Sequence, residues 1–135
     1  MKISFLLAPI LLLSCLNKDE YNPGPTQEKE ISRMTELTIE NRRRDFGLVP
    51  PDTLLTNQFF IVNTGKYDLI VDYVNPDCSC ITYNISQRKI APKDTALLTL
   101  RLSTKGQSGA QRLYTTLSAN TMTKLYSLEM LADVK

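Results

Sequence analysis

The fold is decided by residues 95–103, TALLTLRLS, where apolar and polar side chains alternate more regularly than anywhere else in the chain. Successive side chains of a β-strand point to opposite faces. One face would therefore carry Ala96, Leu98, Leu100 and Leu102, and the other Thr95, Thr99, Arg101 and Ser103. Leu97 is the exception to the alternation. The stretch predicts a strand with one face in a core.

Similar strands are predicted on both sides of this stretch. Their ranges are 35–41, 54–63, 67–74, 80–85, 113–119 and 125–134. Turns rich in Pro, Gly, Asn and Asp separate them, at residues 50–52, 63–66 and 91–94. Asn63 and Gly65 tolerate positive φ, and Asn75-Pro76 is expected to end the strand before it. The absence of a long helical pattern predicts an all-β, Ig-like β-sandwich of about seven antiparallel strands.

The N-terminus reads as a secretion signal. Lys2 precedes an apolar run over residues 3–13, which is too short to span a bilayer. Leu12-Leu13-Ser14-Cys15 resembles the bacterial lipobox, which implies cleavage after residue 14 and lipid chains, such as palmitate, on Cys15. Several acyl chains would make attachment to the membrane effectively permanent. The alternative is a plain signal peptide with an incidental Cys.

The next segment reads as a tether. Residues 15–34 hold Pro23, Gly24 and Pro25 among mostly polar residues, and the sandwich is expected over residues 35–135. Lys18-Asp19-Glu20 resembles the surface-export signal of Bacteroidota lipoproteins, with a solvated tether as the alternative. The expected location is the outer membrane, facing either the cell surface or the periplasm.

The charge pattern excludes some functions. The net charge of +2 is too small to predict nucleic-acid binding, and the sequence has no His to serve as a general base. No spacing supports catalysis by carboxylates such as Asp72 and Asp77, so no enzyme activity is expected. Residues 42–44 are three arginines, which are read as a charged edge that discourages aggregation, or else as a contact for an anionic glycan or lipid headgroup.

With these elements placed, a family resemblance emerges. It is carried by Asp45-Phe46-Gly47, Asn63-Thr64-Gly65, Leu69, Val71, Cys78-Ser79-Cys80, Ile90-Ala91-Pro92, Gly109 and Ala119-Asn120. Over about residues 45–134 the chain resembles a bacterial family called domain of unknown function 1573. The resemblance implies an Ig-like sandwich distantly similar to major-sperm-protein and PapD-type domains, often on secreted or lipid-anchored proteins. Ser79 and Ile81 depart from the family's Cys-Gly-Cys-Thr, and Lys93 stands where a Pro-Gly turn is expected.

Four interpretations compete for Cys78 and Cys80. They are structural packing, a disulfide formed in an oxidising compartment, a soft-metal site such as two-coordinate Cu(I), and a redox or nucleophilic thiol. In an extended strand their Cα atoms would lie roughly 6.6 Å apart, near the upper limit for a disulfide. A disulfide would therefore need a bent backbone.

Two further sites are predicted from short motifs. Asp52-Thr53-Leu54 and Asp94-Thr95-Ala96 resemble the O-glycosylation triplet of Bacteroidota, although Asp and Thr are also common at turns. The sequence favours a non-catalytic, lipid-anchored envelope protein that binds a protein or glycan partner. The alternative is metal or thiol-redox handling by Cys78 and Cys80. No cofactor is expected, apart from Cu(I) in that alternative.

Overall fold

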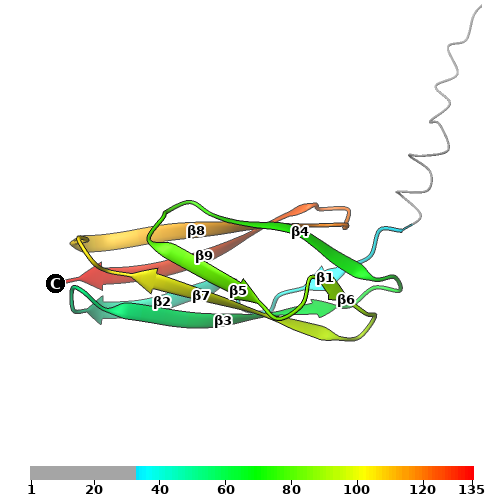
Figure 1. The fold of residues 1–135 in the computed structure, drawn as a ribbon, viewed down its shortest axis with the longest axis horizontal. Helices are drawn as coiled ribbons and strands as arrows, with labels where there is room; N and C mark the ends of the chain where they lie inside the picture. The colour runs from blue at the N-terminus through cyan, green and yellow to red at the C-terminus, as the bar shows by residue number, and fades with distance from the viewer. Residues whose placement is uncertain (1–32) are drawn as a thin grey trace, which may run out of the picture.

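The structure is a computed structural model that describes residues 33–135, which form a sandwich of two β-sheets (Figure 1). The strands are β1 (Leu37–Thr38), β2 (Arg43–Val49), β3 (Leu54–Asn63), β4 (Leu69–Pro76), β5 (Ile81–Ile85), β6 (Lys89–Ile90), β7 (Thr95–Ser103), β8 (Gly109–Ala119) and β9 (Leu125–Val134). One sheet has the order β1-β3-β7-β5 and the other β2-β9-β8-β4-β6. The described chain enters at the end where β1 and β6 lie, and it finishes at the opposite end.

The core lies between the sheets and is built by alternation. The four apolar residues predicted to share a face of β7 are all fully buried, and β3 adds Phe59 and Ile61. From the other sheet come Leu128 and Met130 of β9, both 1% exposed or less. Burying side chains of this size contributes roughly 1.5–3 kcal/mol each. The fold therefore depends on this shared layer.

Several predictions are confirmed. The bounds of β3, β7 and β9 coincide with the predicted ranges 54–63, 95–103 and 125–134. The predicted inward face of β9 is also buried, from Tyr126 to Val134 at every second residue. Two of these strands, β3 and β7, lie in one sheet, and β9 lies in the other. The predicted all-β sandwich is therefore confirmed.

The first part of the domain was predicted incorrectly. The strand expected over residues 35–41 is reduced to the two residues of β1, and residues 43–49 form an unexpected strand, β2. β2 pairs in parallel with β9, so the sheets are not purely antiparallel. After β1 the chain no longer pairs with β3, and it crosses to the other sheet, where β2 pairs with β9. Side-chain alternation does not encode this change of partner. Arg43 and Arg44 thus lie on an edge strand, as the aggregation-blocking interpretation requires.

Two local features differ from what the sequence suggested. Asn75-Pro76 does not end its strand, because β4 continues through Pro76 and the chain turns only afterwards. The predicted turn at residues 63–66 is present after β3, although neither Asn63 nor Gly65 adopts the positive φ that these residue types tolerate. Positive φ does occur at Lys93, with φ of 69°, where the family resemblance implied glycine. A side chain is rarely found in this region because its Cβ crowds the backbone.

Some predictions cannot be placed. The signal peptide at residues 1–14, Cys15 and Lys18-Asp19-Glu20 lie outside the described residues, as does almost all of the tether at residues 15–34. Over residues 33–135, no helix has the length and apolar character needed to cross a membrane.

Candidate functional site

The most open feature of the sandwich is one edge of β3. Along residues 54–62 this strand pairs with β7 on one side. On its other side, β1 pairs only with Asn63 and Val62. Within residues 33–135 no strand pairs with this side of β3 from Leu54 to Ile61. A strand-sized space is left beside β3, which we call the β3 slot.

The hydrogen-bonding groups that face the slot follow from the alternation of the ladder. Asn63 N donates to Asp94 O at 3.0 Å, and at the other end of the strand Thr104 N donates to Thr53 O at 2.9 Å. The main-chain N–H and C=O groups of odd-numbered residues therefore face β7. Thr64 N donates to Glu36 O, on the β1 side. Even-numbered residues therefore direct their N–H and C=O groups into the slot. They are Leu54, Thr56, Gln58 and Phe60.

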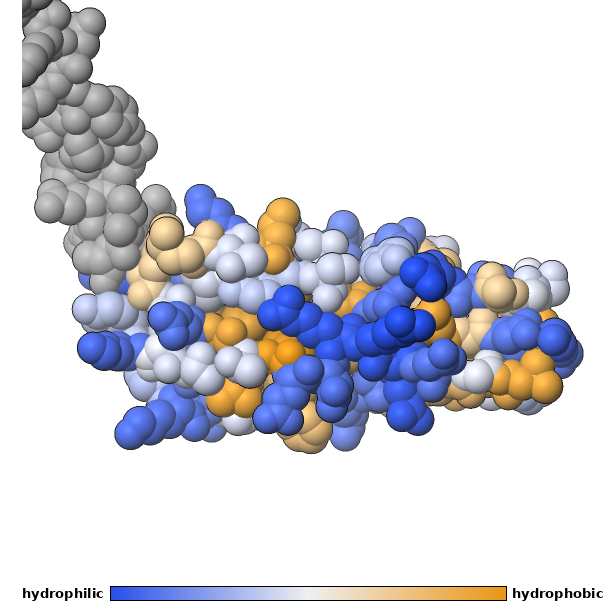
Figure 2. All heavy atoms as spheres, turned by 180° about the vertical axis from the view of Figure 1, so that it is seen from behind, coloured by the Kyte–Doolittle hydropathy of each residue, from blue (hydrophilic) through white to orange (hydrophobic). Residues whose placement is uncertain are grey.

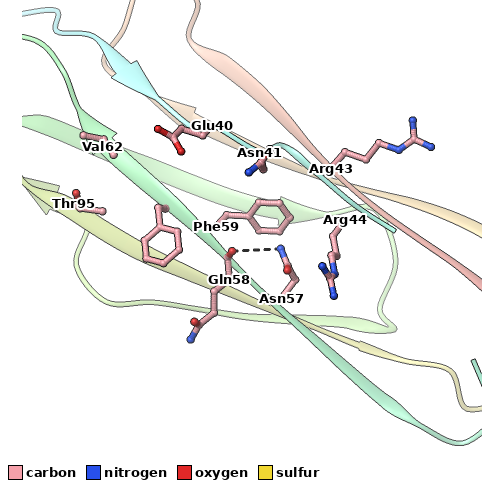
Figure 3. Close-up of a pocket in the computed structure, with 10 residues that line it drawn as sticks. Glu40, Asn41, Arg43, Arg44, Asn57, Gln58, Phe59, Val62 and Thr95 are labelled. Carbon is pink, nitrogen blue, oxygen red and sulfur yellow. Dashed lines mark hydrogen bonds between the residues drawn. The ribbon is translucent and has the colours of Figure 1, made fainter. Parts of the chain in front are cut away.

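A hollow of about 470 Å³ lies at this edge, between β3 and the segment that crosses to the other sheet (Figure 3). It is lined by Glu40, Asn41, Arg43, Arg44, Asn57, Gln58, Phe59, Phe60, Val62 and Thr95. Figure 3 shows Arg44 at the Asn57 end of the hollow and Glu40 toward Val62. Asn57 Nδ2 donates to Gln58 O over 3.4 Å, a long contact that leaves this carbonyl available. Phe60 is 59% exposed and offers an aromatic surface.

The three arginines beside the slot differ in their partners. Arg43 Nε lies 3.5 Å from Glu129 Oε2, and Arg112 Nη1 lies 3.4 Å from Glu129 Oε1, so both arginines form ion pairs with Glu129. Hydrogen bonding with Tyr114, followed by the charge of Glu129, raises the pKa of Arg112, which therefore stays cationic.

Arg42 and Arg44 instead lie over aromatic rings, those of Tyr126 and Phe46, at 5.1 and 5.2 Å from the ring centroids. No ion pair within residues 33–135 involves either of them. Figure 2 shows strongly hydrophilic side chains across the middle of the rear face, with apolar ones exposed between them. The slot thus combines free main-chain groups with one stacked cation that lines the hollow, Arg44.

The cysteines lie in the turn that carries the chain from one sheet to the other. Asp77 N donates to Tyr114 O, on β8, and Ser103 N at the end of β7 donates to Cys80 O. Cys78 and Cys80 are joined by a disulfide with their Cα atoms 5.1 Å apart. The turn brings them closer than an extended strand would. Both are half-buried.

The carboxylates of Asp72 and Asp77 each have a hydrogen-bond partner of their own. No group of three or more His, Cys, Asp or Glu side chains within residues 33–135 is placed to hold a metal ion. Asp77 Oδ2 accepts from Tyr114 N and Asp72 Oδ2 accepts from the Ser118 hydroxyl, so the two carboxylates have separate partners.

The two threonines predicted as glycosylation sites differ in access. Thr53 is half-buried, and its hydroxyl donates to Pro51 O at 3.2 Å. Thr95 is exposed and lines the hollow. Modification of either residue stays a prediction.

Two asparagines, Asn63 and Asn120, hold together the end of the sandwich where β1 and β6 lie, and sequence reasoning did not predict this role. Asn63 is fully buried, and its amide bonds four groups from three segments. Asn120 accepts from Ile70 N at 2.7 Å and donates to the carbonyls of Asp68 and Arg33. Their position within motifs of the resemblance was the available signal.

The comparisons agree with this architecture. The family model described as "Protein of unknown function (DUF1573)" matches residues 37–134. No curated protein matches the chain. A Porphyromonas gingivalis W83 protein of unknown function is similar, with TM-score 0.67 and 15% identity over 76% of this chain, which spans 48% of that protein.

Two other solved structures share the fold. The Vibrio cholerae VesB protease matches 80% of this chain with TM-score 0.61 and 8% identity, and the chain spans 34% of it. The ASH / PapD-like domain 7 of human CEP192 matches all of this chain over 96% of its own length, with TM-score 0.56 and 11% identity. These likenesses show a PapD-like and Ig-like sandwich fold, and no more than the fold.

Proposed function

The chain belongs to the DUF1573 family of proteins of unknown function, and from that premise we propose that it is a non-catalytic, lipid-anchored envelope protein whose Ig-like domain binds a protein or glycan partner. The observation that carries the binding role is the β3 slot. An exposed strand edge is a template for pairing, and proteins usually protect it with charges, prolines or bulges. Residues 54–60 read LLTNQFF and contain none of these.

Anchoring rests on Cys15 and the apolar run before it. The lipid would hold the protein at the outer membrane, with the sandwich on its tether facing the surface or the periplasm. Lys18-Asp19-Glu20 favours the surface. A fixed location lets a weak partner contact act at high local concentration.

One experiment tests anchoring and binding together. A photo-crosslinking amino acid is placed at Gln58 in the full chain, or at Ser127 on the outer face of the other sheet as the matched control. We expect a discrete crosslinked species in the membrane fraction from position 58 only, and its release to the soluble fraction when Cys15→Ser is added. Equal crosslinking at both positions, or none at either, would contradict the binding role. Membrane retention of Cys15→Ser would contradict the lipid anchor.

The second candidate function is metal or thiol-redox handling by Cys78 and Cys80. It is supported by their adjacency in a half-buried turn. We expect alkylation of the non-reduced native protein to add no mass at these residues, and two alkyl groups after reduction. Two groups added without reductant would instead indicate free thiolates able to bind Cu(I), which a competition titration would then measure. Groups added only after denaturation would leave the pair as packing.

A further inference from the structure

We propose that the β3 slot binds an extended acidic peptide segment, which adds to the sheet as a strand beside β3. The inference rests on the proposed binding function and names its partner chemistry. Strand addition supplies affinity through main-chain hydrogen bonds and specificity through alternate side chains. The slot has both elements, namely the even-numbered N–H and C=O groups from Leu54 to Phe60 and the side chains that flank them.

The length and face of the slot define the segment. Four residues of β3 direct main-chain groups outward, so about seven ligand residues would span them at roughly 3.3 Å each. Every second side chain of the ligand would lie on the outer face of the sheet, the face that carries Phe60 of β3 and its partner Leu97 of β7. An apolar residue suits that position, because Phe60 is 59% exposed there.

The charge at the slot selects an acidic ligand. Arg44 pairs in register with the buried Met130, so its side chain lies on the inner side of β2, toward the hollow. Arg42 lies over Tyr126 and is not among the residues that line the hollow. Arg44 is held against the Phe46 ring with its guanidinium group available, which suits a carboxylate. Glu40 lies at the other end of the hollow and disfavours acidic residues there.

A second copy of this chain fits less well. Antiparallel pairing of two β3 edges about Asn57 would place Phe60 opposite Leu54 of the second copy. However, Arg44 lies at the Asn57 end of the hollow, next to that two-fold axis. The two copies would therefore bring their Arg44 side chains together, and like charges in close contact are unfavourable. The arginines thus disfavour self-pairing and favour acidic strands, which joins the two roles considered for them.

The direction of each N–H supplies a selective test. Gln58→Pro removes an N–H that points into the slot, and proline is tolerated where that group faces solvent. Asn57→Pro is its matched counterpart, because the Asn57 N–H faces β7. We expect Gln58→Pro to melt within a few degrees of the unmodified protein and Asn57→Pro to unfold. Unfolding of Gln58→Pro would contradict the assigned edge, and Phe60→Pro would then be tested in the same way.

The binding measurement uses a display library of random dodecapeptides and the full chain in detergent. We expect enrichment of peptides in which Asp or Glu alternates with apolar residues, at least tenfold weaker binding of these by Gln58→Pro, and a switch to Lys- and Arg-bearing peptides with Arg44→Glu. Lys124→Glu, in the turn between β8 and β9 of the other sheet, makes the same change in net charge away from the slot and should bind as the unmodified protein does. Equal selection by Gln58→Pro, or no preference for acidic residues, would overturn the inference.

The two proposals fail differently. If position 58 crosslinks in cells to a glycan or to a neutral or basic protein segment, the acidic peptide is overturned while the binding role stands. If position 58 forms no crosslink, both fall.

Discussion

Replacing Asn63 with Ala is expected to lower the free energy of unfolding by about 4 kcal/mol, because it removes a fully satisfied buried amide. Oδ1 accepts from the Thr35 hydroxyl and from Gly65 N, each at 3.1 Å. Nδ2 donates to Tyr67 O at 2.7 Å and to Ile90 O at 2.8 Å. All four positions of the side-chain amide are therefore used. Alanine would leave these partners without their hydrogen bonds and open a cavity among them.

Thermal unfolding followed by circular dichroism measures this effect, and a loss of this size would lower Tm by more than about 15 °C in a domain of this length. Asn120→Ala is the matched control. Asn120 makes three hydrogen bonds but is only half-buried, so water can replace part of what is lost. We expect it to cost about 1–2 kcal/mol. If the two variants lost equal stability, burial would not be what makes Asn63 important.

The sequence predicted those parts of the fold that depend on alternation. In β7 and β9 the inward-facing residues are apolar and occupy every second position. A shift of the strand by one residue would therefore expose all of these apolar side chains. Alternation does not predict β2, because arginine or glycine occurs on both of its faces, at Arg43, Arg44 and Gly47. A bulge between Asp45 and Leu48 also breaks its register. Such a strand is defined by its partner β9 and carries no pattern of its own.

The candidate site was less accessible to sequence reasoning. Arg42, Arg43 and Arg44 were visible as a charged run, but the β3 slot exists only because β1 pairs with two residues and the chain then changes sheet. Nothing in residues 54–60 distinguishes a strand with one partner from a strand with two. The cysteines were found from the sequence, and the bent backbone that a disulfide between them requires is present as the turn after Pro76.

Gly65→Ala is expected to destabilise the domain by about 2–3 kcal/mol through overpacking. A Cβ on Gly65 would overlap the Thr35 hydroxyl and lie 2.5 Å from Glu36 N, and a backbone atom has little room to move. Gly106→Ala is the control for conformation alone. Gly106 has φ of 72° and open space around its Cα, so its replacement should cost about 1–2 kcal/mol through backbone strain.

Hydrogen exchange separates the two mechanisms for these glycines. Thr64 N and Gly65 N both donate to Glu36 O, and Gly65 N also bonds Asn63 Oδ1. Displacement of β1 by the new methyl group should therefore lower the protection of these two amides, and that of Thr64 most. Gly106→Ala should leave their protection unchanged. Unchanged protection in Gly65→Ala would mean that the close approach is relieved elsewhere. Because β1 occupies the same edge of β3 as the proposed ligand, its release would extend the slot to Val62. Gly65→Ala should then bind longer peptides more tightly, with their acidic residues near Arg44 and not near Glu40, even as it loses stability.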